Sequence, residues 1–160
     1  MNHSQVLPQL YVGSYPESTS EIDRLSRQSS ITAVLNLQTD DDMRHFHLPW
    51  PPLQAHYAAC GIDIRRVPVR DFDPVDLRAK LPECIRVLRE LLAAPHTVYI
   101  HCTAGTGRSP TVVIAYLNWC CSWDLEEAVS HVKRCRQCSP NVEAIRLAIH
   151  NGPAPTGQRG

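Results

Sequence analysis

The stretch that decides the fold is residues 101–110, which read His101-Cys102-Thr103-Ala104-Gly105-Thr106-Gly107-Arg108-Ser109-Pro110. An apolar, β-branched run at residues 97–100 precedes it, and a helix-forming run at residues 111–119 follows it. This order predicts a buried strand, a tight loop and a helix that begins where the loop ends. The loop therefore brings a cysteine, an arginine and several backbone N–H groups to one small volume at a helix N-terminus.

These residue types suit attack on a phosphate ester. A helix N-terminus and a neighbouring arginine favour the thiolate form of a cysteine, so Cys102 is predicted to be a nucleophile. The expected phosphate-binding residues are Thr103, Ala104, Gly105, Thr106, Gly107 and Arg108, with the two glycines allowing backbone angles that other residues resist. Arg108 would hold two phosphate oxygens with its planar fork. The reaction would then pass through a phosphorylated cysteine that water hydrolyses.

Two neighbours are predicted to support the loop. His101 is expected to order it through hydrogen bonds to backbone groups. Ser109 has two interpretations: it donates a hydrogen bond to the departing Cys102 thiolate, or it caps the following helix.

A leaving alkoxide needs a proton, and the segment Val69-Arg70-Asp71-Phe72-Asp73-Pro74 offers two carboxyl groups. Asp73 precedes a proline and is better explained as the cap of a helix. Asp71 is left free on the loop, and it is therefore predicted to be the general acid in the first step and the base in the second.

The glycine-rich loop does not fit a nucleotide-binding site. A Walker motif ends in Gly-Lys-Ser or Gly-Lys-Thr, whereas this chain has Gly107-Arg108-Ser109. A zinc site at Cys135-x-x-Cys138 is disfavoured because no second pair of ligands lies nearby in the sequence. We expect neither a metal nor a cofactor.

Length and composition limit the remaining possibilities. The chain has 160 residues and a formal net charge of zero, which fits one domain and gives no basic surface for nucleic acid. The longest apolar run is too short to span a membrane. Seven scattered cysteines indicate a reducing, intracellular location. Residues 1–152 are expected to form the domain, with residues 153–160 as a disordered tail.

Strands and helices are expected to alternate, which predicts an α/β fold. The expected strands are residues 10–12, 31–37, 62–67 and 97–101. The expected helices are residues 20–28, 54–60, 73–93 and 110–121, one after Asp124, and one from Ser139 to about Gly152. Residues 40–42 are expected to form a solvated loop or a helix start, and residues 48–52 a rigid, proline-rich loop.

The Cys102-x5-Arg108 pattern resembles the signature of the cysteine-dependent phosphatases, and the short chain with its Asp71 loop resembles their dual-specificity branch. The form Cys-x-Ala-Gly-x-Gly-Arg is similar to that of the glucan phosphatases, namely laforin and the plant starch-excess and like-starch-excess enzymes. Residues 34–38, 70–78 and 140–146 also resemble segments of the plant type. The family implies a fold of the protein-tyrosine-phosphatase type, with a central, mainly parallel mixed sheet flanked by helices.

The resemblance implies phosphorylated starch or glycogen as the substrate, with Asp71, Cys102 and Arg108 in the catalytic roles. It makes Phe72 an aromatic platform for glucose rings, although a core anchor for the loop is the other interpretation. Phe46 and Trp50 are further candidates for glucan contact, and His45 replaces an aromatic residue of the plant members. The alternatives are a dual-specificity phosphatase acting on phosphoproteins and a binding module without activity. We expect a monomer in the cytoplasm or a plastid.

Overall fold

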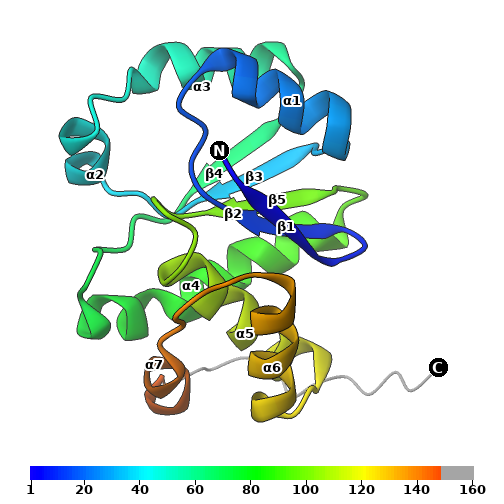
Figure 1. The fold of residues 1–160 in the computed structure, drawn as a ribbon, viewed down its shortest axis with the longest axis vertical. Coiled ribbons are helices and arrows are strands. Elements are labelled where there is room, and N and C mark those ends of the chain that lie inside the picture. Colours follow the sequence, from blue (N-terminus) through cyan, green and yellow to red (C-terminus); the bar gives the residue numbers. More distant parts are fainter. Residues whose placement is uncertain (149–160) are drawn as a thin grey trace.

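The computed structural model describes residues 1–148, and the strands of this part form one mixed sheet (Figure 1). Its order is β1-β2-β5-β3-β4, formed by β1 (His3–Leu7), β2 (Leu10–Gly13), β3 (Ala33–Asn36), β4 (Asp63–Arg66) and β5 (Val98–His101). β1 and β2 are antiparallel, and the other neighbouring pairs are parallel. The expected mainly parallel mixed sheet is confirmed.

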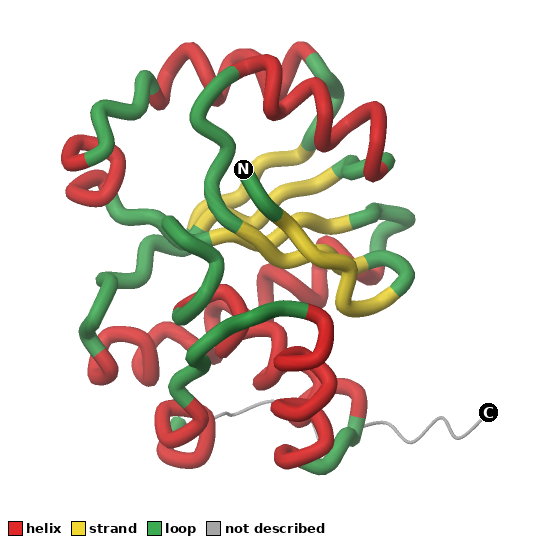
Figure 2. Tube along the Cα trace, in the orientation of Figure 1, coloured by secondary structure: helices red, strands yellow, loops and turns green. Residues whose placement is uncertain are grey.

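Helices cover both faces of the sheet (Figures 1 and 2). One face carries α1 (Thr19–Ser29) and α3 (Trp50–Ala59), and the short α2 (Asp40–His45) lies beside them. The other face carries α4 (Pro74–Ala93) and α5 (Arg108–Cys121), with α6 (Leu125–Cys135) and α7 (Val142–Leu147) packed outside them. No helix among residues 1–148 is long and apolar enough to cross a membrane.

A core lies on each side of the sheet. The smaller core joins the sheet to α1 and α3 and contains Ile22, Leu25, Ile31, Val34, Leu53, Tyr57, Ile62 and Tyr99. The larger core surrounds α5, in which residues 108–115 are all buried. Because a buried aliphatic side chain contributes about 1.5–3 kcal/mol, this packing fixes the first turn of α5 and the loop that leads into it.

Several elements differ from the sequence predictions. Strand β1 was not predicted. Trp50 and the two prolines after it begin α3 instead of forming a loop, because the first turn of a helix does not need their N–H groups. Residues 40–42 begin α2, which is one of the two alternatives. The last helix begins at Val142 rather than Ser139 and ends at Leu147, where Ala148 has an extended backbone, so the predicted helix from Ser139 to near Gly152 is too long at both ends. The predicted tail lies outside the described residues.

The sheet places its carboxyl edge where the sequence predicts the chemistry. Asn36 at the end of β3 is paired with His101 at the end of β5, and the Leu37 amide donates to the His101 carbonyl at 2.9 Å. Loops that leave parallel strands gather at this edge, which is where ligands bind in open α/β sheets. Residues 102–107, the residues before α2 and the Asp71 loop therefore meet there.

Candidate active site

The loop of residues 102–107 turns its carbonyl groups outward. Each carbonyl oxygen of residues 103–107 accepts a hydrogen bond from the surrounding protein. The donors are Tyr15 N for Thr103, Arg136 Nη2 for Ala104, Arg136 Nε for Gly105, Ser139 N for Thr106 and Thr111 Oγ1 for Gly107. A trans peptide directs its C=O and the following N–H to opposite sides. The amides of residues 104–108 therefore point to the inner side of the loop, where they can bind an anion.

Arg136 is a loop-supporting residue that the sequence reasoning missed. It lies at the C-terminus of α6, is buried, and donates from Nε to the Gly105 carbonyl at 2.5 Å and from Nη2 to the Ala104 carbonyl at 3.0 Å. Its Nη2 also donates to Asn2 Oδ1 at 2.6 Å. One guanidinium thus joins the loop to the N-terminal segment.

The two loop glycines differ in what they contribute. Gly105 has φ +71°, and a Cβ there would lie 2.2 Å from Gly13 C, so only glycine fits. Gly107 has φ −113°, and a Cβ there would meet no atom within 4 Å. The expectation of a glycine-only backbone therefore applies to Gly105 and not to Gly107.

Cys102 lies on the floor of the site. The residue is 3% exposed, and its Sγ lies 3.3 Å from Ser109 Oγ. The N-cap of α5 is Gly107, so the alternative of Ser109 as the cap is wrong, and its hydroxyl faces the sulfur instead. His101 Nδ1 lies 3.0 Å from the Cys102 carbonyl. Burial, together with the charge of Arg108, lowers the pKa of His101 to about 4, so its ring is neutral and Nδ1–H donates to that carbonyl.

The guanidinium of Arg108 is held by contacts at both of its terminal nitrogens. Nη1 donates to Asp42 Oδ2 and to the Val69 carbonyl, both at 2.7 Å, and Nη2 donates to Thr103 Oγ1 at 3.1 Å. Nη2 also lies 3.0 Å from Asp71 Oδ2. The buried Nε has no partner among the described residues. The edge formed by Nε and Nη2 is therefore the one that can present two parallel N–H groups to a phosphate.

Asp42 is a second carboxylate at the site, and the sequence reasoning did not select it. Its side chain is 14% exposed, and the carboxylate also accepts from the Thr39 amide at 2.8 Å in a capping box that begins α2. Burial by itself raises the pKa of Asp42, but the hydrogen bonds from Arg108 and Thr39 and the Arg108 charge hold it below its ordinary value. Asp42 therefore stays ionised and fixes one side of the Arg108 guanidinium.

Replacing Asp42 with Ala is expected to lower the free energy of unfolding by about 2–3 kcal/mol, because it removes the N3 half of the capping box and leaves a buried Arg108 N–H without its acceptor. The matched control is Asp41→Ala, since that side chain on the same turn is 83% exposed and its loss should cost below about 1 kcal/mol. Urea denaturation measures both. The Asp42 contribution should be present above the ordinary carboxyl pKa and disappear as the pH falls through the lowered one. Equal losses in the two variants would contradict this role.

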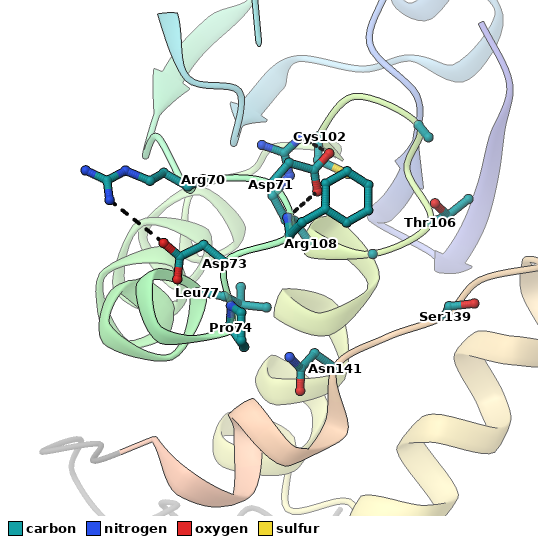
Figure 3. A pocket seen from close by; sticks show the side chains of 13 residues that line it. Arg70, Asp71, Asp73, Pro74, Leu77, Cys102, Thr106, Arg108, Ser139 and Asn141 are labelled. Carbon is teal, nitrogen blue, oxygen red and sulfur yellow. Dashed lines mark hydrogen bonds and ion pairs between the residues drawn. The ribbon is translucent and has the colours of Figure 1, made fainter. Parts of the chain in front are cut away.

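The two aspartates of the 69–74 segment have separate positions. Asp73 caps α4 by accepting from Val75 N at 3.1 Å and Asp76 N at 2.9 Å, as the sequence predicts. Asp71 is not free as expected, because its carboxylate pairs with Arg108 (Figure 3). An exposed loop carboxylate close to a guanidinium gains Coulomb energy by pairing. Of the two carboxylates, only Asp71 pairs with Arg108, whereas Asp73 lies 3.8 Å from the Arg70 guanidinium.

Cys102, Arg108 and Asp71 line one cavity of about 390 Å³. Its lining is Arg70, Asp71, Phe72, Asp73, Pro74, Leu77, Cys102, Ala104, Thr106, Gly107, Arg108, Ser139 and Asn141 (Figure 3). Phe72 lies at the rim with 98% of its surface exposed and φ +55°, so the alternative of a core anchor is wrong. A left-handed backbone at a phenylalanine costs about 1–2 kcal/mol, and here it presents a whole aromatic ring to solvent.

Other predicted site residues lie outside the cavity lining. Thr103 and Gly105 do not line it, although Thr103 Oγ1 contacts Arg108. Phe46 is half-exposed and packs on Tyr15, with ring centroids 5.6 Å apart. The Arg66 guanidinium lies over the Trp50 ring, with its Cζ 5.2 Å from the ring centroid. Trp50 also lines a different hollow beside α2. The start of α3 therefore directs Trp50 away from the candidate active site.

Comparison with known proteins identifies the class to which this fold and site belong. The family model described as dual specificity phosphatase, catalytic domain, matches residues 10–149. Since this match covers most of the chain, the chain belongs to that family. The resemblance drawn from the Cys102-x5-Arg108 loop is thereby confirmed.

The relatives of this chain include two proteins named as phosphoglucan phosphatases. The chain is 34% identical over 148 residues to phosphoglucan phosphatase LSF1, chloroplastic, of Arabidopsis thaliana, covering 92% of this chain and 25% of that protein. It is also 34% identical over 151 residues to phosphoglucan phosphatase DSP4, amyloplastic, of Castanea sativa, covering 92% and 40%. The chain thus spans less than half the length of these relatives. The crystal structure of PTPMT1 shares the fold, with a TM-score of 0.75, 22% identity, and coverage of 92% of this chain and 91% of that one.

Proposed function

We propose that this chain hydrolyses phosphate monoesters through a phosphocysteine at Cys102. The observation that carries the proposal is the convergence of four features on one cavity: a buried thiol, inward amides, the Nε–Nη2 edge of Arg108 and the Asp71 carboxyl group. A nucleophile, an oxyanion site and an acid–base group within one pocket are the parts that acyl or phosphoryl transfer needs. The inward direction of the N–H groups of residues 104–108 makes a phosphate the better fit, because these groups offer donors on several sides.

In the first step the phosphate oxygens bind the amides of residues 104–108 and the Nε–Nη2 edge of Arg108. This edge exchanges its contact with Asp71 for the phosphate, which releases the Asp71 carboxyl group to act as the general acid. Cys102 Sγ attacks phosphorus in line with the ester oxygen. As the S–P bond forms and the P–O bond breaks, Asp71 gives its proton to the leaving oxygen.

In the second step a water molecule attacks the phosphocysteine. The water gives a proton to the Asp71 carboxylate, its oxygen bonds to phosphorus, and the S–P bond breaks to release inorganic phosphate. Ser109, whose Oγ lies 3.3 Å from Cys102 Sγ, donates a hydrogen bond to the departing thiolate. The electrons and protons balance without a metal or a cofactor.

We further propose phosphorylated glucan as the substrate. The matching relatives named as phosphoglucan phosphatases support this choice, and so does the exposed Phe72 ring at the cavity rim. An aromatic face packs well on the apolar face of a glucose ring, and the neighbouring phosphate would reach Cys102. We propose that the chain is a monomer, which analytical sedimentation tests. We also propose that it acts in the cytoplasm or in a plastid, where it would encounter such glucans, and the position of a fluorescent fusion in the cell tests this.

The substrate proposal is tested by phosphate release from solubilised phosphoglucan and from a set of phosphopeptides, each normalised to a small aryl phosphate. We expect the normalised glucan rate to exceed that of a generic dual-specificity phosphatase assayed in parallel. A glucan ratio no better than that of the generic enzyme, with efficient phosphopeptide hydrolysis, would support the phosphoprotein alternative instead.

Replacing Phe72 with Ala is expected to lower phosphoglucan turnover about fivefold to tenfold, because a lost aromatic contact is worth about 1 kcal/mol or more. Aryl phosphate turnover and the melting temperature should stay unchanged, since the ring is almost fully exposed. Val75→Ala is the matched control, because Val75 is an exposed apolar residue in the first turn of α4 that does not line the cavity. Equal losses on both substrates would rule out a glucan platform.

A further inference from the structure

A group of three potential metal ligands lies on the face of the sheet that α1 and α3 cover. Asp23 comes from α1, His56 from the last turn of α3, and Cys60 from the C-cap position of α3. One ligand atom from each lies within 4.8 Å of the other two. The group does not line the cavity at Cys102, so the proposed phosphatase reaction does not use it.

The distances are close to those of a shared metal ion. His56 Nε2 lies 2.8 Å from Asp23 Oδ1, and Cys60 Sγ lies 3.5 Å from the same oxygen. Ligands bound to one tetrahedral Zn²⁺ at about 2.0–2.3 Å lie roughly 3.3–3.8 Å apart. Small side-chain rotations therefore convert the hydrogen-bonded arrangement into a three-ligand site, with water as the fourth ligand.

The donor set selects the metal. A thiolate, an imidazole and one carboxylate suit Zn²⁺ and its neighbours, whereas Mg²⁺ and Ca²⁺ require oxygen ligands. The spacing of His56 and Cys60 by four residues places both on one face of α3. The third ligand comes from a different helix, so a bound ion would connect α1 to α3.

Charge and access also fit a cation. The carbonyl end of α3 carries a partial negative charge, and Asp23 adds a full one, which offset the positive charge of the nearby Arg27. Asp23 and His56 are 34% and 29% exposed, so an ion can enter from solvent. A cysteine binds a metal as the thiolate, so metal binding at Cys60 would release a proton. We propose that Asp23, His56 and Cys60 form a Zn²⁺ site that links α1 to α3.

The test measures binding of Co²⁺ and then Zn²⁺ to the full chain carrying Cys102→Ser, which removes the thiol of the candidate active site. We expect one equivalent of Co²⁺ to give a thiolate-to-metal charge-transfer band that Zn²⁺ abolishes by displacement. Adding Cys60→Ser should abolish the band, and adding His56→Ala should weaken the affinity at least about tenfold. Cys121→Ser, which changes a similarly half-buried cysteine elsewhere, should change neither.

Stability provides the second readout. Zn²⁺ should raise the melting temperature of the Cys102→Ser chain and of its Cys121→Ser derivative, but not that of the Cys60→Ser derivative. If Cys60→Ser alters the fold, Asp23→Asn serves in its place and should also weaken binding at least about tenfold. Absence of the band in the parent chain would overturn the proposal. An affinity for Co²⁺ in the Cys60 and His56 variants equal to that of the parent chain would also overturn it.

Discussion

Replacing Cys102 with Ser is expected to abolish turnover of every phosphate ester, with a fall in kcat of at least roughly 10³-fold. The hydroxyl is somewhat smaller than the thiol and does not ionise near neutral pH, so the attacking group is lost while most of the buried space stays filled. The melting temperature should change little, because the residue is buried in a small, already packed position. The measurement is phosphate release under saturating aryl phosphate, together with a thermal melt.

This variant separates covalent catalysis from other routes. If Cys102→Ser kept appreciable activity at an unchanged melting temperature, water would be attacking phosphorus directly and the covalent route would be wrong. Cys84→Ser is the control, because Cys84 is also buried but lies in α4 away from the cavity. It should retain the full rate per folded molecule.

The second large effect is expected from Arg108→Lys, which should lower kcat/KM by about 10²–10³-fold. Lysine keeps the positive charge but has no planar fork, so it cannot contact Asp42 and the Val69 carbonyl while presenting two N–H groups to a phosphate. The acceptors left without donors should also cost about 1–3 kcal/mol of unfolding free energy. Steady-state kinetics and urea denaturation measure the two effects.

Arg70→Lys is the matched control for the charge. Arg70 belongs to the cavity rim, but its side chain is 73% exposed and points toward Asp73, 3.8 Å away (Figure 3). Its replacement should change kcat/KM by less than about threefold. If Arg108→Lys were as active as Arg70→Lys, the positive charge alone would be sufficient and the fork would have no role.

Local signals explain which parts of the fold could be predicted. The strand, loop and helix around Cys102 follow from an apolar run, a glycine-rich loop and a helix-forming run in direct succession. Asp73 was assigned correctly as a cap because a cap needs only the residues next to it. In contrast, β1 was missed because only Val6 of its five residues is buried, so the strand has no apolar run. Such a strand forms through pairing with β2.

Long-range contacts explain the rest of the differences. Arg136 supports a loop that lies about thirty residues earlier in the chain, and no local pattern around it indicates this. Asp42 reaches Arg108 across 66 residues. Its spacing from Thr39 does match a capping box, so its place in a helix could have been found from the sequence, but its partner could not. Trp50 was expected near the site but lies elsewhere, because the direction of its side chain depends on α3 beginning at that residue.

The most direct test of the phosphocysteine route is acid-quench trapping with phosphoglucan labelled in its phosphate. The chain is mixed with the substrate, quenched within a fraction of a turnover and digested, and the labelled peptide is sequenced. We predict that the label is bound to Cys102 as an acid-stable, iodine-sensitive thiophosphate ester. A burst of phosphate release with no covalent label, or a label on another residue, would contradict the account.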